Sequence, residues 1–389
     1  MGRLLFSKNF IFGCGISDYQ HFGGAKCDLP EIHAARHYEY FDVDFGILES
    51  LGLSAFRTGI EWARIEPREG EIDRSSVDFY HRYFSGLKQT GVTTVVTLHH
   101  FTNPRWIHKF GGWLSAKTGE KFVDYVSLVC HEFGQYIDYY LVFNEPTVYT
   151  QLAYLAGPRG LPPYHKNSRE ARQCLANLDD TIRRSYDAIH DAGGVKVGVA
   201  HAFSALPFAL QRGRNVFGWL FQKLHRNAVC SDHMENWEGK FDFCGVNYYF
   251  KTSLGKPLPN PEGLRRICRE IFRKYRKPIL ITENGLPNRD DTQRTSYLLL
   301  HLESLANAVA LDKTEIIGYC WWSFLHGYEW GRGYKPFFAL VDVDVDGTYK
   351  RKPTQTAYAY SEIARDRGLS QEILQKAQLP RSLEFENWL

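Results

Sequence analysis

The chain has 389 residues, and 44% of them are hydrophobic, which is enough to bury a large core. Lys and Arg total 47 and Asp and Glu total 44, so the formal net charge is only +3. This balance gives no support to a nucleic-acid or acidic-polymer partner. No stretch approaches the roughly 18 apolar residues of a membrane-spanning helix.

The eight cysteines indicate a reducing compartment. None stands in a C-x-x-C pair, and none clusters with histidines at the spacing of a zinc site. Residues 1–15 lack both the long apolar run and the small-residue cleavage site of a secretory signal. We therefore expect buried, reduced thiols and a cytoplasmic location.

Apolar, β-branched runs recur along the whole chain and predict strands. Near-continuous apolar runs are typical of parallel strands that are buried on both faces. In chain order these eight runs are 9–17, 55–60, 93–100, 139–145, 196–203, 241–249, 278–284 and 316–324.

Helical patterns separate the runs, and four of these patterns end at a glycine: Gly52, Gly91, Gly134 and Gly193. Glycine relieves the left-handed strain that follows a helix, after which the next strand begins. Eight strand–helix units predict an α/β fold of the (β/α)₈ TIM-barrel type. We expect residues 1–389 to form a single domain, with 369–389 as a C-terminal tail packed on the outside.

Polar side chains end most of the predicted strands. In a barrel of this kind the chemistry lies at the C-terminal strand ends and in the loops that come after them. Polar groups there cost free energy to bury unless they have partners or a use. The residues that we expect to meet at this face are Arg57, His100, Asn144, Glu145, His201, Asn247, Tyr249, Glu283 and Trp322.

Two of these residues are glutamates that would face each other across the barrel mouth. Glycoside hydrolysis needs such a pair, because one carboxylate attacks the anomeric carbon and a protonated carboxyl group gives its proton to the leaving oxygen. Repulsion from ionised Glu283 would raise the pKa of Glu145 and keep it protonated. We therefore expect Glu145 and Glu283 to be catalytic.

The motifs around these glutamates resemble those of family 1 glycoside hydrolases, the β-glucosidase and β-glycosidase family. NEP at 144–146 and ITENG at 281–285 are similar to its two signature motifs. Further segments resemble the family in the same order, so the resemblance covers most of the chain: FRTGIEWARIEP (56–67), VTLHHFTNPRW (96–106), GGW (111–113), GVNYY (245–249) and WWSFLHGYEW (321–330).

The resemblance implies a role for each matching residue. Glu283 would be the nucleophile and Glu145 the acid/base, with Arg57 and Tyr249 holding the nucleophile. Trp322 would lie under the non-reducing sugar and Trp330 would be a second aromatic in its pocket. The resemblance also implies that the sugar is hydrogen-bonded by Gln20, His100, Asn144 and Glu329. Double displacement by these residues requires no metal or organic cofactor, so we expect none.

The chain departs from the family pattern at several points. His326 and Gly327 replace Asp and Asn of the usual DNFEW, Phe101 replaces Trp, and Phe337–Phe338–Ala339 replaces RFG. These changes leave the catalytic pair intact and bear on the aglycone side and the sugar preference. For His201, which lies in no family motif, we expect packing in the core or a loop.

The expected function is that of a retaining exo-β-glycosidase acting on small β-glycosides, such as glucosides, galactosides or fucosides. A transglycosylase would use the same intermediate, and a non-catalytic sugar-binding barrel is the alternative from another class. The oligomeric state is open. The basic amphipathic pattern at 264–277 could contact a membrane or an acidic partner. An outer barrel helix is the more common structure, with Leu264, Ile267, Ile271 and Phe272 turned inward.

Overall fold

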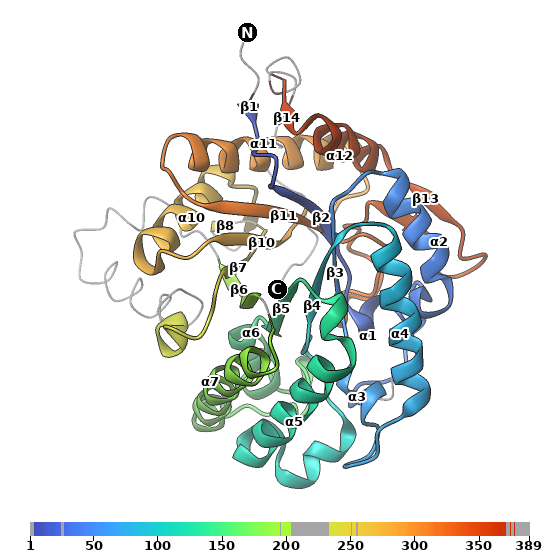
Figure 1. The fold of residues 1–389 in the computed structure, drawn as a ribbon, viewed down its shortest axis with the longest axis vertical. Helices are drawn as coiled ribbons and strands as arrows, with labels where there is room; N and C mark the ends of the chain where they lie inside the picture. Colours follow the sequence, from blue (N-terminus) through green and yellow to red (C-terminus); the bar gives the residue numbers. More distant parts are fainter. Residues whose placement is uncertain are drawn as a thin grey trace.

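A computed structural model describes residues 4–24, 27–194, 196–203, 233–249, 251–253, 256–370, 374 and 377. Its central feature is a closed barrel in which neighbouring strands are parallel, and helices surround it (Figure 1). The eight predicted strands are all present, and each is the same length as the predicted run or shorter. The predicted (β/α)₈ fold is confirmed.

The barrel closes in the order β10-β11-β2-β3-β4-β5-β6-β7. Its strands are β2 (Ile11–Gly15), β3 (Ala55–Gly59), β4 (Thr93–Thr97), β5 (Tyr139–Asn144), β6 (Lys196–Phe203), β7 (Cys244–Tyr248), β10 (Ile279–Asn284) and β11 (Ile316–Trp322). In the part of the chain that the structure describes, three short antiparallel pairs lie outside the barrel: β1 (Leu4–Leu5) with β14 (Gly368–Leu369), β8 (Lys251–Ser253) with β9 (Lys256–Leu258), and β12 (Val341–Val343) with β13 (Arg351–Pro353).

The helices come after the strands in the alternation that the sequence predicts. They are α1 (Asp18–His21), α2 (His37–Ser50), α3 (Trp62–Ile65), α4 (Arg74–Gln89), α5 (Ala116–Phe133), α6 (Pro146–Tyr154), α7 (Ser168–Asp191), α10 (Pro261–Tyr275), α11 (Asp291–Ala310) and α12 (Gln355–Asp366). The short helices α1, α3 and α6 come directly after strand ends and belong to the catalytic face rather than to the outer ring.

Apolar side chains fill the space inside and outside the barrel wall. The interior cluster consists of Ile11, Ala55, Val95, Tyr139, Leu141, Ala200, Phe243, Leu280 and Cys320. A larger cluster lies between the strands and the helices. Glycine is required where strands leave no room: a Cβ on Gly245 would lie 2.6 Å from the Val199 carbonyl oxygen. The interior is therefore a packed core, and a ligand has to bind at its end.

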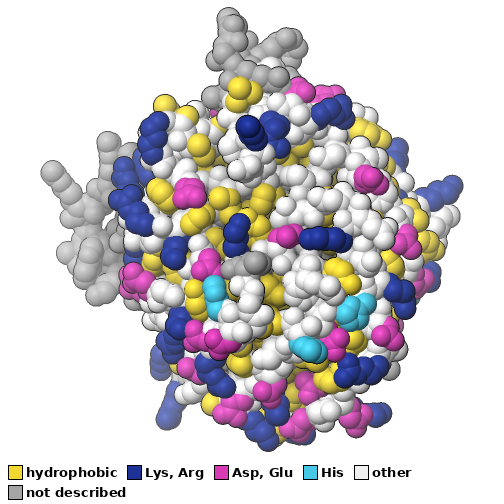
Figure 2. All heavy atoms as spheres, viewed as in Figure 1, with side chains coloured by type: hydrophobic (Ala, Val, Ile, Leu, Met, Phe, Trp, Pro, Cys, Tyr) yellow, Lys and Arg dark blue, Asp and Glu magenta, His cyan; other side chains and the backbone are white. Residues whose placement is uncertain are grey.

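The surface carries mixed charge, and Lys and Arg side chains are interspersed with Asp and Glu in Figure 2. On α10, Leu264, Ile267 and Ile271 are buried while Arg265 donates to Asp312 at 2.8 Å. This arrangement fits the outer-helix interpretation of the basic pattern. None of the described helices is long and apolar enough to cross a membrane.

The seven described cysteines are buried and unpaired, as expected, and Cys230 lies outside the described residues. At the N-terminus, β1 pairs with β14, so Leu4 lies opposite Leu369. Most of the predicted tail at 369–389 also lies outside the described residues, and its packing stays a prediction.

Candidate active site

A cavity of about 210 Å³ lies where the predicted site residues meet. This volume is below the roughly 300–1,000 Å³ of sites for drug-sized ligands, so it suits a single small ring rather than a long chain of sugars. The cavity is lined by Gln20, His100, Phe101, Asn144, Glu145, Val148, Leu152, Tyr249, Glu283, Trp322, Glu329, Trp330 and Phe338. Both glutamates are therefore brought together at one site.

Glu145 lies in the turn that joins β5 to α6. Its φ is +48°, an uncommon left-handed conformation for a residue with a side chain, and Pro146 starts the helix. Proline disfavours the α conformation for the residue before it. The strand end is held because the Glu145 backbone N–H donates to the Ala200 carbonyl at 2.7 Å. The NEP motif thus fixes the direction in which this carboxyl group leaves the barrel.

Glu283 is the penultimate residue of β10 and is almost completely buried. Arg57 Nη1 donates to its Oε1 at 2.5 Å, and the Tyr249 hydroxyl donates to its Oε2 at 2.5 Å. These two donors, one on each oxygen, hold the carboxyl group in a fixed orientation. Gly285 comes two residues later because a Cβ there would lie 2.1 Å from the Trp322 carbonyl oxygen.

A hydrogen-bonded network joins the two glutamates. Arg57 Nη2 donates to Asn144 Oδ1 at 2.7 Å, and Asn247 Nδ2 donates both to that oxygen at 3.0 Å and to Glu145 Oε1 at 2.8 Å. Asn247 is itself held by the Thr282 hydroxyl, which donates to its Oδ1 at 2.7 Å. The positions of both carboxyl groups are therefore coupled through Arg57, Asn144 and Asn247.

The two carboxyl groups have different environments. Burial raises the pKa of Glu145 to about 8, and the charge of Glu283 adds to this shift, whereas the hydrogen bond from Asn247 opposes it. At neutral pH Glu145 is thus mostly protonated, while Glu283 has a guanidinium and a hydroxyl as donors. A proton donor beside an oriented carboxylate is the arrangement that acid-assisted nucleophilic displacement needs.

The predicted sugar-binding residues line the same cavity. Trp322 Nε1 donates to Glu329 Oε1 at 3.3 Å, and the His100 ring stacks on the Trp322 ring with their centroids 5.6 Å apart. Gln20 is buried and donates to the Tyr328 carbonyl at 2.9 Å. Trp330 stacks on Tyr19 at 5.6 Å. These side chains offer a ring face and several hydrogen-bonding groups to one ligand.

Burial also sets the charge of two of these groups. It is the largest cause that raises the pKa of Glu329 to about 8, and the hydrogen bonds from Trp322 and Gln20 partly oppose it. Burial, followed by the charge of Arg57, holds the pKa of His100 well below its usual range. His100 is therefore neutral, and one of its ring nitrogens, Nε2, lies 3.3 Å from Asn144 Nδ2.

The sequence model of the family described as glycosyl hydrolase family 1 matches residues 28–210 and 251–369, which is more than half of the chain. The chain belongs to glycosyl hydrolase family 1. The resemblance seen in the motifs is confirmed.

Individual relatives agree with this assignment. A rice protein named beta-glucosidase-like SFR2, chloroplastic, is 30% identical over 83% of this chain, and human cytosolic beta-glucosidase is 26% identical over 92%. The chain spans 54% of the rice protein and 94% of the human one. A solved structure of a beta-glycosidase from Pyrococcus horikoshii matches 98% of this chain and 99% of its own, with a TM-score of 0.89 and 28% identity.

Some residues of this family 1 site were not given a role from sequence. Asn247 was recognised only as a strand ending, and its contact with Glu145 depends on the register that places it opposite Glu283 on the neighbouring strand. Val148 and Leu152 line the cavity without any motif to mark them, and Phe338 lies in the segment that replaces the RFG of the family pattern. The one signal in the sequence was that Val148 and Leu152 are four residues apart, which would place them on one face of a helix after NEP.

His201 does not join the site. It is buried beside Trp237, with ring centroids 5.9 Å apart, and neither ring nitrogen has a hydrogen-bond partner among the described residues. Burial lowers the pKa of His201 to about 3, so it is neutral. These observations agree with the expected packing role.

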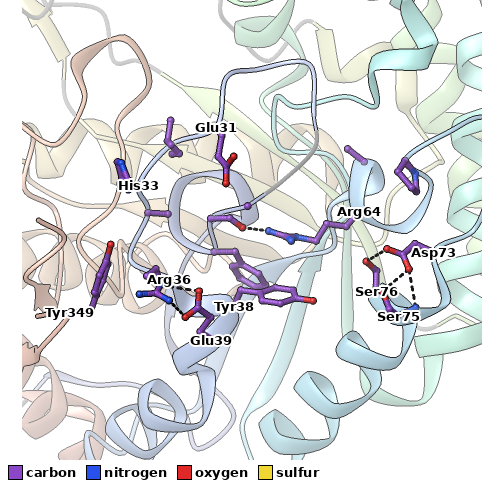
Figure 3. A pocket seen from close by; sticks show the side chains of 17 residues that line it. Glu31, His33, Arg36, Tyr38, Glu39, Arg64, Asp73, Ser75, Ser76 and Tyr349 are labelled. Carbon is purple, nitrogen blue, oxygen red and sulfur yellow. Dashed lines mark hydrogen bonds and ion pairs between the residues drawn. The ribbon is translucent and has the colours of Figure 1, made fainter. Parts of the chain in front are cut away.

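A larger cavity of about 610 Å³ lies outside the barrel mouth, between the segment before α2 and the helices α3 and α4 (Figure 3). Four of its charged side chains have local partners: Arg36 pairs with Glu39, Arg64 donates to the Gly23 carbonyl, and Asp73 caps α4. It holds neither member of the glutamate pair. The smaller cavity is therefore the candidate active site.

No group of three or more His, Cys, Asp or Glu side chains within the described ranges has an arrangement that could hold a metal ion. The donor atoms of the cavity are instead paired with one another through the network of Arg57, Asn144 and Asn247.

Proposed function

We propose that this protein is a retaining exo-β-glycosidase that hydrolyses small β-glycosides. One observation carries the proposal: Glu145, with a pKa raised to about 8, shares a cavity with Glu283, which Arg57 and Tyr249 hold through both of its oxygens. The same cavity presents Trp322 and Glu329 to a ligand, as a sugar-binding site requires.

In the first step, a Glu283 oxygen forms a bond to the anomeric carbon while the bond from that carbon to the leaving oxygen breaks. Glu145 gives its proton to that oxygen, so the aglycone leaves as a neutral alcohol. Arg57 and Tyr249 orient Glu283 for the attack. The intermediate is an ester of the sugar with Glu283.

In the second step, the negative charge of Glu283 is absent, so the pKa of Glu145 falls and the ionised carboxylate accepts a proton from water. The water oxygen attacks the anomeric carbon, and the bond to Glu283 breaks. Two inversions give net retention, and we expect the two carboxyl groups to lie about 5–5.5 Å apart, as retaining enzymes require.

The substrates that we propose are β-glucosides, β-galactosides or β-fucosides. The cavity volume favours one terminal sugar ring, hence exo action. Glu329 accepts a hydrogen bond from Trp322 and lies beside Gln20, and this group reads sugar hydroxyls through hydrogen bonds. A cytoplasmic location stays part of the proposal, and fractionation of expressing cells would test it.

A panel of 4-nitrophenyl glycosides tests the proposal. We expect release of nitrophenol from β-glycosides and not from α-glycosides, with the Glu283→Gly variant as the inactive control. Proton NMR taken early in the reaction should show the β-anomer of the free sugar. An initial α-anomer would contradict retention, and a protein inactive on every β-glycoside would point to a sugar-binding barrel.

Transglycosylation is a second candidate, because one relative suggests it. An Arabidopsis protein named galactolipid galactosyltransferase SFR2, chloroplastic, is 28% identical over 86% of this chain, which spans 60% of that protein. The covalent intermediate would be the same, and an alcohol would replace water as the acceptor. Product analysis with and without an added acceptor distinguishes the two: a dominant new glycoside at modest acceptor concentration would identify a transglycosylase.

A further inference from the structure

Thirteen of the residues that the structure describes line the active-site cavity, and they fall into two sets of different chemistry. The polar set consists of Gln20, His100, Asn144, Glu145, Tyr249, Glu283, Trp322 and Glu329. The apolar set consists of Phe101, Val148, Leu152, Trp330 and Phe338. The polar set together with Trp330 matches one sugar ring, whereas Phe101, Val148, Leu152 and Phe338 offer no polar side-chain group.

The apolar set begins beside the proton donor. Glu145 is the N-cap of α6, and Val148 and Leu152 lie three and seven residues further along, four apart on one face of that helix. Leu155 continues this face at the C-terminal end of α6, and 40% of its surface is exposed. Because Glu145 protonates the leaving oxygen, the group attached to that oxygen lies where this row of aliphatic side chains begins.

Aromatic rings form another part of the apolar set and are fixed by their neighbours. The Trp330 ring lies 5.1 Å from Phe101 and is stacked on Tyr19 at 5.6 Å. Phe338 packs against Tyr249, with ring centroids 5.7 Å apart. Phe101 and Phe338 are each no more than 5% exposed. Packing already holds these rings in place, so ligand binding costs little side-chain conformational entropy.

The chemistry of the two sets discriminates between leaving groups. A second sugar would bring hydroxyl groups against Val148, Leu152 and Phe101, and a buried hydroxyl without a partner is unfavourable. An alkyl chain would instead bury its apolar surface against the aliphatic side chains of α6, and the burial of each methylene is favourable.

We propose that the aglycone of the preferred substrate is an apolar chain, bound by Val148 and Leu152, with Leu155 at its outer end. This inference rests on the proposed β-glycosidase function and adds to it the class of the leaving group. The shared chemistry covers soluble alkyl glycosides as well as glycosides of lipids.

The test uses butyl, hexyl and octyl β-D-glucosides below their micelle concentrations. Their alkoxide leaving groups are chemically alike, so differences in kcat/KM report binding along the chain. Full burial of one methylene would raise kcat/KM about fourfold. We expect a rise of about twofold per methylene, because the aliphatic side chains on α6 are partly exposed. Octyl glucoside should therefore exceed butyl glucoside by on the order of tenfold, and cellobiose should be a poorer substrate than either.

Three variants locate the effect. Leu152→Asn should flatten the dependence on chain length, and Leu155→Asn, at an exposed position that tolerates a polar residue, should lower kcat/KM for octyl glucoside alone. Leu311→Asn is the matched control, because Leu311 is 66% exposed at the end of α11 and lies outside the cavity. It should leave the whole series unchanged.

The outcomes distinguish a failure of the apolar aglycone from a failure of the proposed glycosidase function. If 4-nitrophenyl β-glucoside is hydrolysed but kcat/KM is flat or falls from butyl to octyl, or if cellobiose is preferred, the apolar aglycone is wrong and the glycosidase stands. If no β-glycoside is hydrolysed, the proposed function itself is wrong. A glucosylated diacylglycerol in phosphatidylcholine vesicles forms a second arm: its turnover supports a lipid source, and a rising soluble series without it supports free alkyl glycosides.

Discussion

The polar set of the cavity includes residues of the barrel strands, whereas no member of the apolar set stands on a barrel strand. Glu283 and Asn144 stand on barrel strands, where the ladder and buried hydrogen bonds fix them. Val148, Leu152 and Phe338 stand on a short helix and a loop, and the Phe338 carbonyl accepts a hydrogen bond from Trp321 Nε1 at 2.8 Å. Under the proposed function, the attacking carboxylate therefore depends on the barrel wall, while the choice of leaving group depends on the helix and loops beyond the strand ends.

The largest effect is expected from breaking the support of the polar set. Arg57→Met removes a fully buried guanidinium that donates to Glu283 and Asn144. We expect kcat/KM to fall on the order of 10²–10³-fold for every aglycone, since an aimed charged donor is lost, and the thermal midpoint to fall as well. Steady-state kinetics with unfolding scans would check this. A loss confined to alkyl glycosides would contradict the division into two sets.

Removing Glu329 tests sugar recognition within the polar set. Glu329→Ala should lower kcat/KM on the order of 10–10²-fold for a glucoside, because a buried sugar hydroxyl left without its partner costs about 1–3 kcal/mol. A deoxy-glucoside that lacks the contacted hydroxyl should lose less, because it has no such bond to lose. Equal losses for all sugars and deoxy analogues would remove Glu329 from the recognition role.

A smaller effect is expected at Gly327, which replaces the Asn of the family pattern. A Cβ on Gly327 would lie 2.4 Å from Nε2 of His21, so the His21 ring would have to move. That ring packs edge-on against Trp322, at 5.7 Å between centroids. Gly327→Ala should therefore lower kcat/KM about tenfold by displacing the sugar platform.

His21→Ala supplies the control for this clash. In the double variant the added methyl group has room, so the Gly327→Ala change should cost less than it does alone. Strict additivity of the two changes, measured through kcat/KM, would show that His21 and Gly327 are not coupled.

The smallest effect concerns pH. Because Glu145 must be protonated and burial raises its pKa to about 8, kcat/KM should be level near neutral pH and fall as pH rises through about 8. The hydrogen bond from Asn247 lowers the pKa of Glu145, so Asn247→Ala should move this fall to higher pH.

Glu329 also has a pKa of about 8, so the fall of kcat/KM near this pH has to be assigned to one of the two glutamates. In Glu145→Gly, glycosylation by a dinitrophenyl glycoside needs no acid, and its rate should lose the fall near pH 8. If the fall persists in this variant, it belongs to Glu329 instead of Glu145.

The sequence predicted the polar set well because its residues end strongly apolar runs. Arg57, Asn144, Glu145 and Glu283 lie at or near the ends of such runs, and the C-terminal strand ends of a barrel meet at one face. The role of Asn247 could not be inferred in this way, because it depends on the register between β7 and β10. Register in a parallel barrel is set by all strands together, which a single run does not reveal.

The apolar set and the helix boundaries were harder to predict. Phe338 comes after β11, beyond a stretch of loop and short helix, and no periodic pattern places it at the cavity. Helix α2 begins at His37, five residues before the sequence DVDFGILESLG (42–52) that predicts a helix there, and it is kinked at Tyr40. Aromatic residues at its start pack as well in a helix as in a loop, so the pattern has no clear beginning there.

The division of labour between Glu145 and Glu283 is tested most directly by the configuration of azide products. With a dinitrophenyl β-glucoside and added azide, Glu145→Gly should give the β-glucosyl azide, because Glu283 still forms the intermediate and azide replaces water. Glu283→Gly should give the α-azide, because azide attacks from the nucleophile's side. NMR of the two products decides the matter. An α-azide from the Glu145 variant together with a β-azide from the Glu283 variant would mean that the two roles are reversed.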